Sequence, residues 1–184
     1  MKRFALLLVL AACSKKPSSD EAARLAAFDQ YRQPNRVVAA LGLRRGQRVA
    51  DVGAGHGYLT FRLADAVGSE GLVVATDIDD EALDALRSHK AKNVVVRKVS
   101  PSEPGLEAGS FDLILLSEVD QYLPDRVAFL KKLRTMLAPG GRIAVTNRRG
   151  FRPALVEAAE QAGYQIVGEF NELPAHFLLF LQPR

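Results

Sequence analysis

Residues 49–60, "VADVGAGHGYLT", place Gly53, Gly55 and Gly57 at alternate positions between an apolar run and an amphipathic one. Glycine destabilises the interior of helices and strands, so a cluster of glycines marks a tight turn or a close approach of backbone to a ligand. A simple turn from strand to helix explains one glycine and leaves the others unexplained. The stretch therefore predicts a strand, a ligand-binding loop and a helix in succession.

Strand and helix patterns alternate along the rest of the chain. Apolar runs and helical spacing predict strands at 47–53, 71–79, 93–99, 110–119 and 142–147, and helices at 57–68, 79–89, 124–137 and 152–163. Two earlier helices are expected at 20–31 and 34–42, and a final pair of strands at 164–170 and 176–182. Alternation implies parallel pairing with right-handed crossovers, and a strand pair close in sequence adds an antiparallel edge. We expect a single α/β domain with a doubly wound, seven-stranded, mostly parallel sheet.

The composition is that of one folded domain. The chain has 184 residues, 48% hydrophobic and 25% charged, which suits a globular protein with a proper core. Its formal charge is +4, and without Lys2 and Arg3 it has 23 basic against 21 acidic side chains, or +2. A balance so close to neutral gives no reason to expect a nucleic-acid partner.

The N-terminus, "MKRFALLLVLAAC", has the layout of a secretory signal: a basic start, a short apolar run and small residues. Its last four residues resemble the lipobox of bacterial lipoproteins, in which the cysteine is lipidated and becomes the new N-terminus. Cys13 is the only cysteine, so there is no disulfide framework and no thiolate metal site. We expect a signal segment at 1–13, a tether at 14–19, a domain at 20–184, and a lipid anchor at Cys13 in the bacterial cell envelope. The alternatives are a chance cysteine and a cytoplasmic protein.

The glycine loop fits neither of two common nucleotide-binding motifs. The dinucleotide fingerprint G-x-G-x-x-G would need a small residue at Tyr58, and the lysine of a P-loop is absent. The loop with its preceding acid, "VADVGAGHG", resembles the first motif of class I S-adenosylmethionine-dependent methyltransferases. Further motifs resemble theirs in order: "VVATDID", "GSFDLILLSEV" and "LAPGGRIAV". The resemblance covers residues 33–182, and "YRQPNRVVAALGLRRG" before the loop is similar to a group of small envelope-targeted methyltransferase-like proteins.

This resemblance implies S-adenosylmethionine as cofactor and a set of cofactor-binding residues: Asp51, Gly53, Ala54, Gly55, Gly57, Asp77, Ile78, Ser117 and Glu118. The glycines would let the backbone approach the methionine part, and Asp51 would orient the loop or receive the ammonium through water. Asp77 would accept hydrogen bonds from the ribose hydroxyls, since a carboxylate has two acceptor oxygens and no donor. Its alternative role, capping the next helix, suits Asp79 better.

One position departs from the family pattern. Many relatives carry an acid after the third strand that holds the adenine amino group, whereas this chain has Ser100 there, with Ser102 and Glu103 nearby. The adenine contacts are therefore not assigned.

The acceptor of the methyl group leaves a weaker signal, and no catalytic residue is predicted. Asp120, Gln121 and Tyr122 either face the acceptor or form a polar approach to a helix. Arg148, Arg149 and Arg152 either receive an anionic acceptor or form a solvated basic loop, which we favour. The histidines suggest no metal site: His56 is expected to be a solvent-facing loop residue, and His89 and His176 lack metal-ligand spacing.

Three functions remain open from sequence. The first is a methyltransferase acting on a small-molecule or lipid acceptor. The second is an envelope-anchored, non-catalytic binding protein with the same fold. The third, a nicotinamide-dependent oxidoreductase, is weakened by Tyr58 in the fingerprint position.

Overall fold

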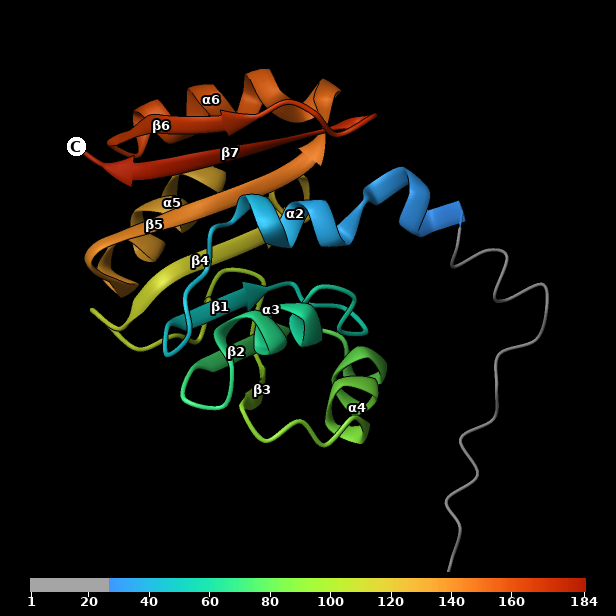
Figure 1. The fold of residues 1–184 in the computed structure, drawn as a ribbon. Coiled ribbons are helices and arrows are strands. Elements are labelled where there is room, and N and C mark those ends of the chain that lie inside the picture. Colours follow the sequence, from blue (N-terminus) through green and yellow to red (C-terminus); the bar gives the residue numbers. More distant parts are fainter. Residues whose placement is uncertain (1–26) are drawn as a thin grey trace, which may run out of the picture.

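The computed structural model describes residues 27–184, which form one seven-stranded sheet in the order β3-β2-β1-β4-β5-β7-β6 (Figure 1). The strands are β1 (Arg48–Val52), β2 (Leu72–Asp77), β3 (Val94–Lys98), β4 (Phe111–Ser117), β5 (Leu137–Arg148), β6 (Tyr164–Phe170) and β7 (His176–Pro183). Neighbours among β1 to β5 pair in parallel, and β7 is antiparallel to both β5 and β6. This confirms the predicted sheet. The antiparallel character comes from β7, which lies between β5 and the edge strand β6.

Helices cover both faces of the sheet, as a doubly wound fold requires. They are α2 (Pro34–Ala40), α3 (Thr60–Val67), α4 (Asp80–Ser88), α5 (Arg126–Met136) and α6 (Arg152–Gln161), with short 3₁₀ turns η1 (Asp120–Tyr122) and η2 (Arg149–Phe151). In Figure 1, α2 and α3 lie in front of the sheet and α5 and α6 behind it. Residues 27–32 are also helical, in agreement with part of the predicted helix 20–31. The predicted signal at 1–13, the tether at 14–19 and residues 20–26 lie outside the described residues.

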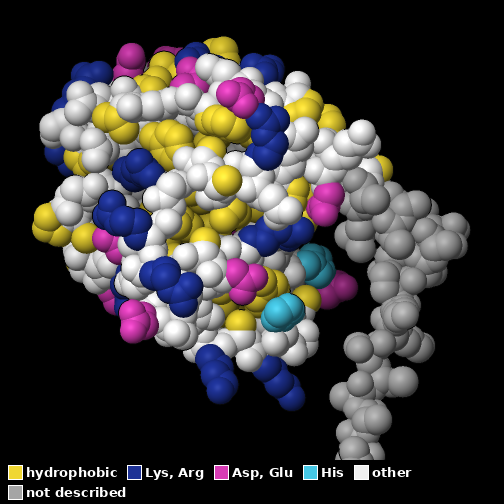
Figure 2. All heavy atoms as spheres, in the orientation of Figure 1, with side chains coloured by type: hydrophobic (Ala, Val, Ile, Leu, Met, Phe, Trp, Pro, Cys, Tyr) yellow, Lys and Arg dark blue, Asp and Glu magenta, His cyan; other side chains and the backbone are white. Residues whose placement is uncertain are grey.

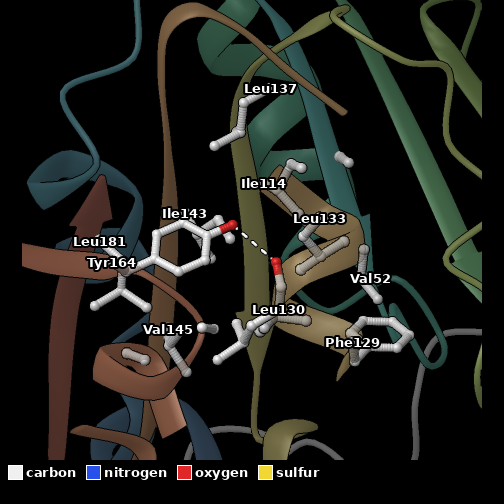
Figure 3. Close-up of a cluster of buried hydrophobic side chains, with 14 of the residues drawn as sticks. Val52, Ile114, Phe129, Leu130, Leu133, Leu137, Ile143, Val145, Tyr164 and Leu181 are labelled. Carbon is white, nitrogen blue, oxygen red and sulfur yellow. Dashed lines mark hydrogen bonds between the residues drawn. The ribbon is translucent and has the colours of Figure 1, made fainter. Parts of the chain in front are cut away.

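Alternate strand residues face opposite layers, which gives the fold two cores. Val49 and Leu115 pack with the apolar side of α3, whereas Ile114 and Leu116 pack with α5 and α6. Figure 3 shows the second core, where the buried Tyr164 hydroxyl donates a hydrogen bond of 2.9 Å to the Leu130 carbonyl. Because this hydroxyl is satisfied, a tyrosine can lie in an otherwise apolar layer.

The junction between α5 and β5 differs from the prediction. The helix predicted at 124–137 ends at Met136, and Leu137 instead opens β5, paired with Phe111. The next pair is Leu113 with Arg142, so "APGG" at 138–141 bulges out of a strand that continues on both sides. Leu137 has helical spacing from the leucines of α5, but its side chain can be buried equally well when the residue belongs to the strand. Periodicity alone does not separate these two placements.

The order of the strands places a ligand crevice at the carboxyl end of β1. The chain continues from β1 to β2 on one side and later to β4 on the other, so β1 and β4 flank the switch point at which open α/β sheets bind ligands. No helix within residues 27–184 is long and apolar enough to cross a membrane.

Candidate cofactor site

The glycine loop, residues 53–57, follows β1 directly and is fixed to β2. The N–H groups of Gly53 and Ala54 both donate to the Thr76 carbonyl, at 2.8 and 3.0 Å. A Cβ on Gly53 would lie 2.3 Å from Cγ2 of Val119, and the backbone φ there is +71°. A Cβ on Gly57 would lie 2.5 Å from the Phe61 ring. Two of the three glycines are therefore required by close packing inside the protein.

Gly55 has a different reason to be glycine. Its φ is +53°, and no heavy atom lies within 4 Å of the place where a Cβ would be. Its N–H donates to Oδ2 of Asp77 at 2.7 Å. The loop thus presents bare backbone to open space at this point, which is the arrangement expected where a ligand approaches the main chain.

Asp77, the last residue of β2, organises this loop. Besides Gly55, it accepts hydrogen bonds at Oδ1 from the N–H groups of Ile78, at 2.7 Å, and Asp79, at 3.0 Å. A carboxylate has about four acceptor positions, so three are taken and about one is left for a ligand hydroxyl. Asp79 caps α4 by accepting a hydrogen bond from the Ala82 N–H at 2.8 Å. This confirms the prediction that Asp79 is the capping residue.

Two cavities adjoin over the loop and contain most of the predicted cofactor-binding residues. The first, which we call the Asp77 cavity, measures about 390 Å³, and its lining includes Gly53, Asp77, Ile78, Ser117 and Glu118. The second, the Asp51 cavity, measures about 360 Å³, and its lining includes Asp51, Gly53, Ala54, Gly55 and Ser117. Gly57 lines neither cavity. The structure thus brings eight of the nine predicted residues together, and their binding roles stay predictions.

Asp51 is a buried carboxyl beneath the loop. It is 2% exposed, and its Oδ2 accepts a hydrogen bond of 2.6 Å from the Thr60 hydroxyl. Burial raises the pKa of Asp51 to about 6, the Thr60 hydrogen bond opposes this shift, and the charge of Asp77 adds to it. A cationic ligand group in the Asp51 cavity would favour the charged form of this side chain.

Glu118 lies at the end of β4 in a left-handed backbone conformation, with φ of +55°. Its carboxylate pairs with Arg32, through Nε at 3.1 Å and Nη2 at 2.6 Å, and also bonds Nε2 of His176. Burial raises the pKa of Glu118, but the hydrogen bonds and charges of His176 and Arg32 outweigh it and hold the pKa below its ordinary value. Glu118 is therefore an ion-paired carboxylate at the edge of the Asp77 cavity.

Sequence reasoning missed Arg32, Phe28 and Tyr58 as parts of the site. All three line the Asp51 cavity, and Arg32 lines the Asp77 cavity as well. Phe28 and Arg32 come from the helical residues 27–32, which precede the first strand, and although Arg32 lies in the segment "YRQPNRVVAALGLRRG", that resemblance assigned it no cofactor contact. Only their amphipathic spacing signalled a packed helix, and spacing does not show what a helix covers.

Of the three residues after β4 that the sequence singled out, Asp120 is buried and Tyr122 is exposed. Asp120 is fully buried, accepts from Nδ2 of Asn147 at 2.6 Å and pairs with Arg126 at 3.3 Å. Burial raises the pKa of Asp120, against the Asn147 hydrogen bond and the Arg126 charge. Gln121 donates to the Glu118 carbonyl at 2.8 Å, whereas Tyr122, at 76% exposure, lines the Asp77 cavity. The polar approach to a helix therefore describes Asp120, and of the three residues Tyr122 alone lines the Asp77 or Asp51 cavity.

The region after β3 does reach the Asp77 cavity. Ser100 and Glu103 both line it, and Glu103 is ion-paired with Lys132. The Ser102 carbonyl accepts from the same Lys132 at 3.0 Å. Ser100 therefore keeps the place of the expected acid in the lining, with a hydroxyl where many relatives have a carboxylate.

The basic loop after β5 is engaged in contacts of its own. Arg149 donates to the carbonyls of Asn171 and Leu173, at 3.1 and 2.9 Å, and Arg152 pairs with Glu169 at 2.8 Å. Neither these two arginines nor Arg148 lines the Asp77 or Asp51 cavity. The favoured interpretation is a solvated basic loop: Arg148 and Arg149 are exposed, in agreement with it, but Arg149 and the half-buried Arg152 also bind groups of the protein.

The histidines have three different surroundings. His56 is exposed in the glycine loop and lines the Asp51 cavity, as expected of a loop residue. His89 stacks on the Phe61 ring with centroids 3.6 Å apart, and His176 is buried against Glu118. In the part of the chain that the structure describes, no group of three or more His, Cys, Asp or Glu side chains could hold a metal ion.

The two cavities fit the chemistry of the expected cofactor. S-Adenosylmethionine combines a ribose and a base with a zwitterionic amino acid. The Asp77 cavity offers a carboxylate with spare acceptor capacity beside the apolar Ile78, Val99 and Phe129. The Asp51 cavity offers a carboxyl, a guanidinium and open space in front of Gly55.

Comparison with known proteins shows which family the chain resembles. The family model described as "Methyltransferase domain" matches residues 43–176. Aklanonic acid methyltransferase from a Streptomyces strain is 36% identical over 106 residues, which are 55% of this chain and 48% of that protein. A ubiquinone/menaquinone biosynthesis C-methyltransferase from Cronobacter sakazakii is 33% identical over 142 residues, 73% of this chain and 56% of that protein. The chain thus spans about half the length of the curated relatives it matches.

A solved structure shows the same fold at low identity. The SAM-dependent methyltransferase from Aquifex aeolicus superposes with a TM-score of 0.79 at 21% identity, covering 90% of this chain and 98% of that one. The resemblance predicted from the motifs is confirmed at the level of the family: the chain belongs to the methyltransferase domain family.

Proposed function

We propose that the chain is an S-adenosylmethionine-dependent methyltransferase that acts on a small-molecule or lipid acceptor. The observation that carries the proposal is Gly55, whose backbone faces open space in the Asp51 cavity while its N–H is held by Asp77, a residue that lines the adjoining cavity. Family membership supports a methyltransferase. The names of the aklanonic acid and ubiquinone/menaquinone relatives support a small-molecule acceptor.

In this proposal the residues of the site hold and align the reactants. Asp77 would accept a hydrogen bond from a ribose hydroxyl, Ile78 would contact the base, and Asp51 would bind the ammonium group. The bound cofactor supplies a methyl group activated on a positively charged sulfur. Because methyl transfer of this kind is a direct displacement, much of the catalysis is alignment of acceptor and methyl group. A general base is needed only where the acceptor must lose a proton early, and we assign none.

The two competing functions have less support. Membership of the methyltransferase domain family argues against a binding protein that does not turn over. An oxidoreductase would need a small residue at position 58, where the tyrosine ring packs edge-on against Phe28 and its hydroxyl donates to Asp29 at 2.7 Å. A tyrosine at this position departs from the small residue that the dinucleotide fingerprint requires.

We further propose that the protein is held in the bacterial cell envelope through a lipidated Cys13, like the small envelope-targeted group whose segment before the glycine loop it resembles. The support is the signal layout of residues 1–13 and the position of the single cysteine. A membrane location would bring lipid acceptors within reach. The alternative is a cytoplasmic protein, in the compartment where the cofactor is made.

Ligand binding tests the enzyme proposal. The full chain should bind S-adenosylmethionine and S-adenosylhomocysteine in calorimetric titrations and should show no binding of NAD. Absence of binding to both adenosyl ligands at millimolar concentration would contradict the methyltransferase and favour the non-catalytic protein.

Mass spectrometry of the native N-terminus tests the location. A mature chain that begins at an acylated Cys13 is expected, and Cys13→Ala should abolish acylation. More than one acyl chain gives stable anchoring, because each buried methylene contributes about 0.8 kcal/mol. A native protein that keeps Met1 and carries no acyl mass would contradict the envelope location and favour the cytoplasm.

A further inference from the structure

Arg32 lies in the cofactor site although no motif assigned it a role there. It lines both the Asp77 cavity and the Asp51 cavity, together with Gly53 and Ser117, so it lies where the two cavities adjoin. Among the described side chains that line the Asp51 cavity, Arg32 is the one with a permanent positive charge. An anionic ligand group in that cavity therefore has one side-chain cation to pair with.

The guanidinium is held in place before any ligand arrives. Glu118 binds it along one edge, through Nε and Nη2. Its carbon Cζ lies 4.8 Å from the ring centre of Phe28 and 5.4 Å from that of Tyr58, and the side chain is 16% exposed. An arginine oriented in this way loses little freedom when it binds a second partner.

The opposite edge of the guanidinium has donors to spare. Arginine carries five N–H donors, and within residues 27–184 Nη1 makes no hydrogen bond. A carboxylate matches two neighbouring donors of a guanidinium, and such charge-assisted pairs are the strong ones. The geometry of Arg32 therefore suits a carboxylate ligand.

Arg32 also belongs to an element that can be tied down by a ligand. Besides Arg32, the helical residues 27–32 contact the body of the protein through Asp29, which bonds Tyr58 and pairs with Arg62, through the Phe28 ring against Tyr58, and through Tyr31, whose ring lies 5.1 Å from that of His176. Gln33, with φ of +48°, separates this helix from α2. The helix is thus joined to the sheet by a few side chains around the cavities.

We propose that Arg32 binds the carboxylate of the cofactor's amino-acid end, that Glu118 is its positioning residue, and that the cofactor thereby fastens residues 27–32 over the site. The inference rests on the proposed function. The amino-acid end is a zwitterion, and the Asp51 cavity supplies a partner for each charge: Arg32 for the carboxylate and Asp51 for the ammonium. Cofactor binding and the position of the N-terminal helix are then coupled through one side chain.

Two ligands isolate the carboxylate. S-Adenosylhomocysteine has it, whereas decarboxylated S-adenosylhomocysteine keeps the ammonium and lacks the carboxylate. The full chain, Arg32→Gln and Glu118→Gln are titrated with both ligands by calorimetry. Arg36→Gln is the matched control, because Arg36 pairs with the exposed Glu172 and lines neither cavity.

Arg32→Gln should weaken S-adenosylhomocysteine binding about 10- to 100-fold, the range for losing a hydrogen bond to a charged group. It should change binding of the decarboxylated ligand less than about twofold, and Arg36→Gln should change neither. Glu118→Gln should fall between wild type and Arg32→Gln in its preference for the carboxylate. An equal loss for both ligands would overturn the carboxylate role, as would no loss for either. No binding of either ligand by wild type would overturn the proposed function itself.

Hydrogen exchange provides a readout for the helix. In wild type, S-adenosylhomocysteine should slow amide exchange in residues 27–33 more than the decarboxylated ligand does. In Arg32→Gln, this difference should disappear. Equal protection by both ligands in wild type would overturn the coupling.

Discussion

The three glycines of the loop make separable predictions, because the structure gives them different surroundings. Gly53→Ala places a methyl group 2.3 Å from Cγ2 of Val119 at a residue with φ of +71°. The left-handed conformation costs a non-glycine residue about 1–2 kcal/mol, and forcing a methylene into a packed site costs about 1–3 kcal/mol. The variant should therefore lose about 2–5 kcal/mol of its free energy of unfolding.

Gly55→Ala is the matched comparison. Its φ of +53° carries the same conformational cost, but nothing lies within 4 Å of the new methyl group. We expect a loss of stability of only about 1–2 kcal/mol. The methyl group enters the space that the cofactor would occupy, so affinity for S-adenosylhomocysteine should fall roughly tenfold or more, equivalent to about 1.4 kcal/mol.

Chemical denaturation and calorimetric titration of the two variants decide the matter. Gly53→Ala should be the less stable protein, and Gly55→Ala should show the larger loss of affinity relative to its loss of stability. If Gly55→Ala binds the ligand like wild type, the open space before Gly55 is not the binding site. If both variants lose stability equally, the contact with Val119 does not constrain Gly53.

Two further predictions concern the carboxyl groups of the site. Asp77→Ala should weaken S-adenosylhomocysteine binding by about 1–3 kcal/mol and also lower stability, since three N–H groups lose their acceptor; unchanged affinity in calorimetry would make Asp77 purely structural. Burial raises the pKa of Asp51 to about 6 from its ordinary 3.8, so the folded state binds the proton more tightly than the unfolded state does. Protonated Asp51 therefore stabilises the fold below about pH 4, and this stabilisation is lost as pH rises through 6. The free energy of unfolding of wild type minus that of Asp51→Asn should therefore fall by up to about 3 kcal/mol between pH 4 and 7, and a pH-independent difference in denaturation would refute it.

The sequence predicted those features of the fold that depend on residues close together in the chain. The buried strands follow from apolar runs, the glycine loop from backbone conformations that glycine adopts most easily, and the acid Asp77 from its place at the end of the parallel strand β2. These constraints are local, so they leave a local pattern. The same reasoning placed Asp79 as the cap of α4, because a capping acid directly precedes its helix.

The features that the sequence missed or left open have one physical origin, which is that their partners are distant in sequence. Arg32 meets Glu118 across 86 residues, and Asp120 meets Asn147 across 27. A polar residue in a loop looks alike in sequence whether it faces solvent or a buried partner. The "APGG" bulge belongs here too, since only pairing of Leu137 with Phe111 shows that β5 begins before it.

The surroundings of the two cavities favour an apolar acceptor over an anionic one. Tyr122 and Ile78, which line the Asp77 cavity, are 76% and 54% exposed, and Phe28, which lines the Asp51 cavity, is 44% exposed. Single exposed apolar residues are ordinary on proteins. Ile78 is assigned to the base of the cofactor, but Tyr122 and Phe28 put further apolar surface on the linings of the two adjoining cavities.

The charged residues agree with this interpretation. On the face shown in Figure 2, Lys and Arg side chains are interspersed with Asp and Glu instead of forming a field of one sign. Arg149 and Arg152 are engaged by backbone carbonyls and by Glu169, so their donors are directed to the protein itself. An acceptor recognised mainly through anionic groups would find those arginines already paired. An acceptor with a large apolar surface would instead meet the exposed side chains of Tyr122 and Phe28. Lipids and apolar small molecules both have such a surface, and this is why we place both in one proposed substrate class.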